Sequence, residues 1–352
     1  MSHPLHVVLP AGVDDPAAPS GGNRYDREVV DRLRAGAGSR SATSGVREST
    51  APGTWPRPAP ADREQLSWVL AEIPDRATVL IDGLVACGVP EVLEPHAARL
   101  RLVILVHLPL SDETGLSAAD AAELRALERR ALHLAAGVIA TSSQAAAHVA
   151  AMHDLTGVHV ALPGVDRAEP ATPSPTGHRL LCVASLTHRK GQDLLIRALA
   201  QLTDLSWECT LVGAGPIPAH PDTGNIRFTG ALAGADLEAA YANADLFVLP
   251  SRAETYGMVI TEALAHALPV VATEVGGVPE ALGSAPSGVP GSLVPPEDPD
   301  HLAAVLRTWL TDPDLRDRWR ARARARRETL TGWDDTARQL ATILEDIEKG
   351  TA

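Results

Sequence analysis

The stretch from Leu246 to Glu280 most limits the folds open to this chain, because it alternates two apolar strands with two helices. The apolar run Leu246–Leu249 predicts a buried strand, and the apolar spacing after Gly257 predicts a helix. A second apolar run, Val270–Thr273, is followed by Gly276 and another helix start. Strand, helix, strand and helix in this order form the unit of a parallel sheet. The connecting loops then lie at the carboxyl ends of the strands, where open α/β sheets bind ligands.

Two glutamates flank the start of the first of these helices. Glu254 lies in the loop, and Glu262 lies within the helix. Gly257, Met258 and Val259 form the first turn between them, where unpartnered N–H groups make a site for an anion. Carboxylates accept hydrogen bonds from hydroxyl groups, so the pattern favours a nucleotide-sugar, in which hydroxyls flank a diphosphate. A bare pair of glutamates at this spacing would more often be solvated helix residues.

The whole stretch resembles the E-x7-E region of the retaining glycosyltransferases of family 4, which have the GT-B fold. Tyr256 stands for the usual Phe of that region, and His266-Ala267 for a small residue and Gly. The matching residues are Glu254, Gly257, Glu262, Ala263, Pro269, Val270, Val271, Ala272, Gly276, Gly277 and Glu280. The resemblance implies an α/β protein with two Rossmann-like domains that face each other across a cleft. It also implies a UDP- or GDP-sugar donor, with no other cofactor and no metal.

A lysine follows the strand predicted at 180–185. Lys190-Gly191 resembles the family's Lys-Gly turn, whose lysine grips the donor diphosphate, but the family's Gly-Arg pair is Ala184-Ser185 here. Arg189 and Arg252 are the two candidates to replace the missing arginine. Lys190 is also one of only two lysines among 31 basic residues, and a compact charge on a flexible stem suits a phosphate. The alternative is a solvated surface lysine.

Further donor contacts follow from the resemblance. Gly213 begins the tight turn G-A-G-P after the strand predicted at 208–213, and Leu232 follows the strand predicted at 226–230. Both are expected to flank the donor base. The predicted catalytic residues are His107, Glu254 and Lys190. The predicted donor-binding residues are Gly21, Gly22, Ser185, Lys190, Gly213, Leu232, Glu254, Tyr256, Gly257, Met258, Val259 and Glu262.

The amino-terminal half contributes a glycine pair and a histidine to these predictions. Gly21 and Gly22 end a loop before a helix expected from about Arg24, and they match the family's Gly-Gly beside the diphosphate; the alternative is a flexible turn. His107 ends the strand predicted at 102–108, where the family's histidine faces the transferred sugar; the alternative is a partly buried packing residue. Asp82 ends the neighbouring strand and either shares the site or caps a helix.

The expected domains are an amino-terminal Rossmann-like acceptor domain over residues 1–168 and a donor-binding domain over 177–330, joined by a proline-rich linker. The last helix, within 333–352, is expected to pack back on the first domain. Residues 36–62 show almost no apolar periodicity and predict a surface loop. Residues 90–100 predict a helix.

Composition excludes some partners. A net charge of −13 argues against nucleic acid, which needs a basic face. No apolar run is long enough to span a bilayer and no secretory signal is visible, which favours a cytoplasmic protein without membrane association. Three scattered cysteines predict reduced core residues, and the excess of arginine, alanine, proline and glycine suggests a bacterial source. The two D-P-D triplets each precede a helix and predict caps, so no metal site is assigned.

The sequence therefore predicts a retaining glycosyltransferase that moves a hexose to a small soluble acceptor. A non-catalytic nucleotide-sugar sensor or scaffold on the same fold is the alternative, kept open by Ser185 in place of the family's arginine. An epimerase on this fold would lack the E-x7-E stretch and the Lys-Gly turn, and it ranks third.

Overall fold

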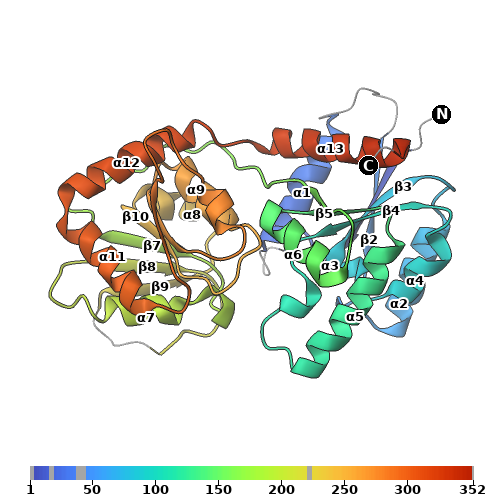
Figure 1. Cartoon of the computed structure of the whole chain (residues 1–352), viewed down its shortest axis with the longest axis horizontal. Coiled ribbons are helices and arrows are strands. Elements are labelled where there is room, and N and C mark those ends of the chain that lie inside the picture. The colour runs from blue at the N-terminus through green and yellow to red at the C-terminus, as the bar shows by residue number, and fades with distance from the viewer. Residues whose placement is uncertain (1–3, 16–19, 37–44, 220–223, 351–352) are drawn as a thin grey trace. The chain divides into compact units, whose positions relative to one another are not determined.

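The computed structural model describes residues 4–15, 20–36, 45–219 and 224–350 (Figure 1). The chain divides into two compact units: unit 1 comprises residues 1–164 and 332–352, and unit 2 comprises residues 165–331. Each unit has its own six-stranded sheet, in which every neighbouring pair of strands is parallel. The fold is α/β, with helices on the faces of both sheets.

The sheet of unit 1 has the strand order β2-β1-β3-β4-β5-β6. Its strands are β1 (Leu5–Pro10), β2 (Val46–Ala51), β3 (Thr78–Asp82), β4 (Arg101–Val106), β5 (Gly137–Ala140) and β6 (His159–Val160). Its helices are α1 (Gly21–Arg34), α2 (Pro60–Ala71), α3 (Gly83–Ala86), α4 (Pro90–Leu93), α5 (Ala118–Leu134), α6 (Ser143–His153) and α13 (Trp333–Lys349), with short 3-10 turns at 94–96 and 110–112. Helices α1 and α13 cover one face of the sheet, and α2, α4 and α5 cover the other (Figure 1).

The sheet of unit 2 has the strand order β12-β11-β10-β7-β8-β9. Its strands are β7 (Arg179–Val183), β8 (Glu208–Val212), β9 (Ile226–Gly230), β10 (Leu246–Leu249), β11 (Val270–Thr273) and β12 (Gly291–Val294). Its helices are α7 (Gln192–Leu199), α8 (Gly234–Ala242), α9 (Met258–Ala265), α10 (Val278–Leu282), α11 (Pro299–Thr311) and α12 (Pro313–Arg327), with a 3-10 turn at 188–190. The central strand β10 is wholly buried, which explains its uninterrupted apolar sequence.

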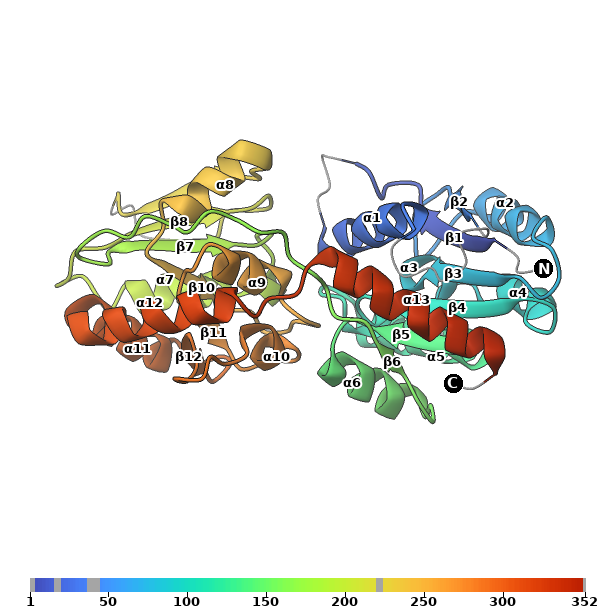
Figure 2. The ribbon, with the colours of Figure 1, turned by 90° about the horizontal axis from the view of Figure 1, so that it is seen from above.

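The last helix, α13, packs against α1 within unit 1 (Figure 2). The rings of Trp333 and Tyr25 meet edge to face, with their centroids 5.7 Å apart. The hydroxyl of Thr336 donates to the carbonyl oxygen of Leu162 at 2.8 Å. Gly164 lies so close to the backbone of Trp333 that a methyl group would overlap it. These contacts fix the end of the chain to the unit in which it begins.

The prediction of a loop over residues 36–62 is wrong at residues 46–51 and from residue 60 onward, whereas residues 52–59 do form a loop. Residues 46–51 form β2, which lies at the edge of the sheet beside β1, and α2 begins at Pro60. The strand has no apolar alternation because it is an edge strand and its Glu48 takes part in an ion pair with Arg27 at 3.0 Å. Residues 37–44 lie outside the described residues.

Two other boundaries differ from the sequence prediction. Helix α1 begins at Gly21 rather than near Arg24, because Ser20 is the N-cap and accepts a hydrogen bond from the N–H of Asn23 at 3.0 Å. The glycine pair is therefore the first turn of a helix and not the end of a loop. The helix expected over 90–100 is only α4, and it continues as a 3-10 turn to His96.

None of the described helices combines the length and the apolar character needed to cross a bilayer. The three cysteines, Cys87, Cys182 and Cys209, are free and buried, as their apolar surroundings in the sequence predicted.

Candidate functional site

Two loops of unit 2 meet because β7 and β10 are neighbouring parallel strands, with Leu180 opposite Leu246. Parallel strands end at the same edge of a sheet, so the segments that follow them leave from one place. The segment after β7 carries Lys190, and the segment after β10 carries Glu254. The ammonium Nζ of Lys190 donates to Oε1 of Glu254 at 2.6 Å, across 64 positions of sequence. The structure thus brings together two of the three predicted catalytic residues.

The carboxylate of Glu254 is held inside this loop cluster. Its side chain is only 6% exposed, and the hydroxyl of Ser251 also donates to Oε1, at 2.7 Å. The guanidinium of Arg189 lies 3.9 Å from the other oxygen, Oε2. Oε1 therefore accepts from two donors, whereas Oε2 accepts no hydrogen bond from the described residues and has a cation 3.9 Å away.

Glycine is required where the two loops touch. Gly191 has a φ of +68°, and a methyl group on it would overlap the carbonyl oxygen of Pro250. The backbone N–H of Arg252 donates to the carbonyl oxygen of Arg189 at 2.7 Å, which ties the loops together beside Gly191. The position of Lys190 relative to Glu254 therefore depends on this close backbone approach.

Helix α9 begins shortly after Glu254. Its N-cap residue is Gly257, with a φ of +93°, and no side chain among the described residues caps the first-turn N–H groups. Met258 and Val259 are half-buried in that turn. The helix begins where the sequence predicted, and the binding of an anion at its positive end stays a prediction. The ring of Tyr256 is instead buried within unit 2, which raises the pKa of its hydroxyl to about 12.

Tyr241 orients the second glutamate, a role that its sequence position did not reveal. Its hydroxyl donates to Oε2 of Glu262 at 2.8 Å. The Tyr241 ring is almost fully buried and stacks on His266, with centroids 4.8 Å apart and an interplanar angle of 15°. In the sequence, Tyr241 begins the segment Y-A-N-A-D before β10, which resembles a segment of the family. This resemblance does not predict the contact between Tyr241 and Glu262.

The other donor residues predicted in unit 2 lie in loops of the same sheet. Ser185 is exposed in the segment after β7, and Leu232 is half-buried after β9. Gly213 lies against the carbonyl oxygen of Ala184, so it allows the loops after β7 and β8 to approach. Arg252, considered as a replacement for the family's arginine, is bound by the carboxylate of Asp193 at 2.7 and 2.8 Å.

A second cluster lies in unit 1, around His107. β3 and β4 are neighbours, so Asp82 at the end of β3 and His107 just beyond β4 leave from the same edge of the sheet. Nε2 of His107 is hydrogen-bonded to Oδ1 of Asp26, on α1, at 2.8 Å. Gly22 lies under the imidazole, since a methyl group on Gly22 would be only 3.2 Å from Cδ2 of His107. Gly22, Asp26 and His107 therefore lie together.

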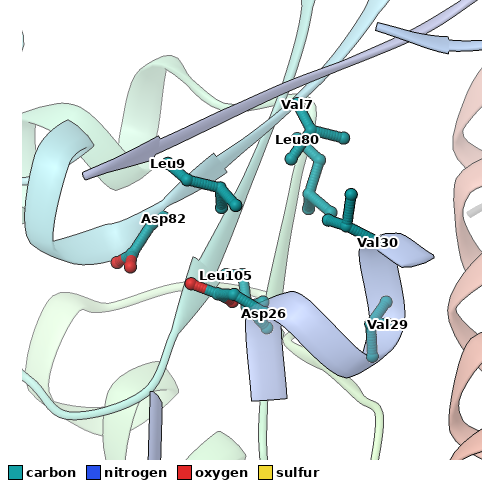
Figure 3. Close-up of a pocket in the computed structure, with 8 residues that line it drawn as sticks. All are labelled: Val7, Leu9, Asp26, Val29, Val30, Leu80, Asp82 and Leu105. Carbon is teal, nitrogen blue, oxygen red and sulfur yellow. The ribbon is translucent and has the colours of Figure 1, made fainter. Parts of the chain in front are cut away.

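Asp26 and Asp82 line the same small cavity, and their carboxyl groups point toward one another (Figure 3). Oδ1 of Asp82 accepts the N–H of Leu84 at 2.7 Å, so Asp82 also caps α3, the alternative role that its sequence position suggested. The other residues that line the cavity are apolar: Val7, Leu9, Val29, Val30, Leu80 and Leu105. Two carboxyl groups therefore share a poorly solvated space.

Burial and proximity shift the proton affinities in this cluster. Burial raises the pKa of Asp82 to about 8, and the charge of Asp26 acts in the same direction. Burial alone would lower the pKa of His107, but the charge and hydrogen bond of Asp26, with a contribution from Asp82, outweigh it and raise this pKa to about 9. At neutral pH, Asp82 is therefore mostly protonated and His107 is mostly cationic.

Asp26, Asp82 and His107 are close enough together to hold a metal ion, since their possible ligand atoms all lie within 4.8 Å of one another. They are the group of this kind found among the described residues. The direct hydrogen bond between His107 and Asp26 accounts for their contact without an ion. We therefore assign no metal ligands here.

The raised pKa of Asp82 makes the stability of unit 1 depend on pH. The folded protein keeps this proton up to about pH 8, whereas an unfolded aspartate releases it near about pH 4. Between these values the unfolded state binds fewer protons, so the free energy of unfolding falls as pH rises. The slope for one such group approaches about 1.4 kcal/mol per pH unit.

Asp82→Asn is expected to remove this slope while keeping the oxygen that accepts the Leu84 N–H. The free energy of unfolding of the wild type, minus that of the variant, should then decrease steadily from pH 5 to pH 8. Urea unfolding at four pH values measures it. A difference that stays constant over this range would contradict proton retention by Asp82.

A sequence model described as glycosyl transferases group 1 matches residues 177–312. A D-inositol 3-phosphate glycosyltransferase of Catenulispora acidiphila is 32% identical over 295 residues, which cover 75% of this chain and 68% of that protein. The chain spans less of several other curated relatives, between 18 and 62% of their length.

Solved structures share the fold of the whole chain. Sucrose-phosphate synthase from Thermosynechococcus elongatus superposes with a TM-score of 0.76 at 20% identity, covering 98% of this chain and all of that one. HepE from Anabaena, solved in complex with UDP-glucose, superposes with a TM-score of 0.70 at 21% identity, covering 97% of this chain and 99% of that one. At these identities the likeness concerns the fold, which is the GT-B fold.

Proposed function

The chain belongs to the glycosyl transferases group 1 family, and on this basis we propose that it is a retaining glycosyltransferase. It moves a hexose from a nucleoside-diphosphate sugar to a hydroxyl of a small soluble acceptor. The observation that carries the proposal is the contact of Lys190 with the buried carboxylate of Glu254 at 2.6 Å, in the loop that leads to the uncapped start of α9. HepE, which shares the fold, was solved with UDP-glucose.

The donor diphosphate binds to the positive groups of this cluster. Lys190 uses one N–H for Glu254 and has two left for phosphate oxygens. The N–H groups of Met258 and Val259 at the start of α9 supply further donors. These groups stabilise the charge that develops on the diphosphate as the bond to the sugar breaks.

The two glutamates bind hydroxyl groups of the donor. Glu262, fixed by Tyr241, accepts from the ribose, and Oε2 of Glu254 accepts from the hexose. In the transfer step, the bond between the anomeric carbon and the diphosphate breaks and a bond to the acceptor oxygen forms on the same face. A diphosphate oxygen takes the acceptor proton, and the products are the glycoside and the nucleoside diphosphate. No metal takes part in this step.

A panel of UDP- and GDP-hexoses tests the proposal in the full chain. The true donor should raise the melting temperature, since a ligand at 100 times its dissociation constant adds about 2.7 kcal/mol of stability. It should also release nucleoside diphosphate when an acceptor is present, and the product should keep the anomeric configuration of the donor. Glu254→Ala should abolish both effects. Wild-type protein that neither binds nor turns over any of these donors would overturn the proposal.

A non-catalytic nucleotide-sugar sensor is the second candidate, favoured by one observation. Ser185 stands where the family has arginine, and Arg252 is held by Asp193 and Glu297 rather than free to replace it. A sensor would bind the donor and show the thermal shift, but it would release no nucleoside diphosphate with any acceptor.

Tyr241→Phe should weaken donor binding without changing the chemistry. The variant keeps the ring stacked on His266 and loses only the hydroxyl that donates to Glu262. Loss of one hydrogen bond of about 1 kcal/mol predicts a KM for the donor about five-fold higher, with kcat nearly unchanged. Initial-rate kinetics measure this, and an equal fall in kcat and kcat/KM would contradict a role confined to holding Glu262.

A further inference from the structure

The histidine cluster of unit 1 contains two carboxyl groups that the proposed reaction does not use. We propose that Asp26 is a positioning residue that holds His107 as a doubly protonated imidazolium, with Asp82 as a neutral acid bound to Asp26. His107 then acts on the sugar or the acceptor only as a hydrogen-bond donor and never as a base. The role in catalysis rests on the proposed function, whereas the charge state of the cluster does not.

The geometry fixes which edge of the imidazole is available. Nε2 faces the Asp26 carboxylate, which is only 1% exposed, while the His107 side chain as a whole is 17% exposed. The ring is held between Gly22 and the edge-on ring of Tyr25, whose centroid lies 5.2 Å away. Nδ1 has no hydrogen-bond partner among the described residues, so it is the nitrogen that can reach a substrate.

A buried oxygen of Asp26 that lacks a hydrogen-bond donor indicates that Asp82 carries a proton. Oδ2 of Asp26 is buried and accepts no hydrogen bond from the described residues. Asp82 lines the same cavity, with its carboxyl group toward that of Asp26, and one Asp82 oxygen already accepts the Leu84 N–H. A proton on Asp82 turns a contact between two acceptors into a hydrogen bond, which removes the cost of leaving Oδ2 without a partner.

The charges within the cluster then balance. Among the residues that the structure describes, the titratable groups that face His107 are Asp26 and Tyr25 on α1 and Asp82 at the end of β3. Tyr25 is neutral, because burial raises its pKa far above the usual value. With Asp82 also neutral, the Asp26 carboxylate and the imidazolium form a single ion pair. Two ionised carboxylates in the same apolar cavity would repel each other and lose solvation.

Nuclear magnetic resonance of the imidazole in the full chain tests the charge state without any substrate. His107→Gln identifies the signal by its loss. In the wild type, the His107 signal should remain that of an imidazolium up to about pH 8. In Asp26→Asn the titration midpoint should fall by roughly one pH unit or more, because burial remains and the counter-charge is gone. Asp82→Asn should lower it less, since Asp26 stays in place.

Asp112→Asn is the matched control. It breaks another pair in unit 1, between Nε2 of His148 and Asp112, with the same 2.8 Å distance but with the histidine half exposed. The His107 titration should be unchanged in this variant. Far-ultraviolet circular dichroism confirms that each variant is folded.

The rate of sugar transfer tests the catalytic role. The plot of log kcat against pH should fall above about pH 9 in the wild type, and this fall should begin roughly one pH unit lower or more in Asp26→Asn, with the donor KM little changed. A wild-type His107 that titrates near its ordinary value, or a titration unmoved in Asp26→Asn, overturns the inference. A stoichiometric divalent metal found in the purified protein, bound to His107, overturns it as well. Loss of transfer in every protein, with the predicted titrations intact, would reject the proposed function and leave the charge state established.

Discussion

Lys190→Ala should lower the rate of sugar transfer by roughly 10² to 10³-fold, the usual cost of removing one preorganised group that stabilises charge in the transition state. The ammonium is the cation bound to Glu254, whereas the Arg252 guanidinium is bound to Asp193 and Glu297. Most of the loss should appear in kcat, since the diphosphate gains charge as it leaves. Steady-state kinetics with the donor identified by thermal shift measure the effect.

The chain offers a matched control in its other lysine. Lys349→Ala removes the same charge from the end of α13, where the side chain is 60% exposed and contacts Glu345 at 3.3 Å. Its transfer rate should equal that of the wild type. The Lys190→Ala protein should be less stable than the wild type, because Glu254 loses its nearest cation, but Ser251 and Arg189 remain beside the carboxylate. Circular dichroism shows that the protein assayed is folded. Equal activity of the two lysine variants would show that Lys190 does not bind the leaving group.

Gly191→Ala should destabilise unit 2 by about 3 kcal/mol or more and abolish transfer at the same time. Alanine at a φ of +68° is strained, and its methyl group would overlap the carbonyl oxygen of Pro250. The loops after β7 and β10 must then separate, which moves Lys190 away from Glu254. Differential scanning calorimetry measures the loss of stability, since the two units need not unfold together.

Gly224→Ala separates the strain from the overlap. Gly224 has a nearly equal φ of +70°, but no atom of the described residues lies within 4 Å of its added methyl position. This variant should lose only about 1 kcal/mol and keep its activity. If both variants lose the same stability, the close approach of the two loops is not what requires glycine at 191.

The sequence predicted unit 2 more closely than unit 1, for reasons visible in single elements. Strand β11 occupies the predicted residues Val270–Thr273, because a central parallel strand is buried on both faces and is apolar throughout. Strand β2 was missed because it is an edge strand with the polar sequence V-R-E-S-T-A. Its glutamate is explained only by neighbours such as Arg27, which no local pattern includes.

Local pattern by itself determined the α/β class, because buried strands, glycine turns and helix starts are encoded by residues near one another in the chain. Lys190 and Glu254 were predicted with the help of the family resemblance, and the structure brings their side chains into contact. Only the tertiary structure decided that Asp26 pairs with His107, across 81 positions, and that Tyr241 holds Glu262. It also paired Arg252, one of the two candidates to replace the family's arginine, with Asp193 across 59 positions. The physical reason is that the order of the strands and the packing of the helices determine which side chains contact a buried charged group. Strand order and helix packing do not produce a periodic pattern of residues in the sequence.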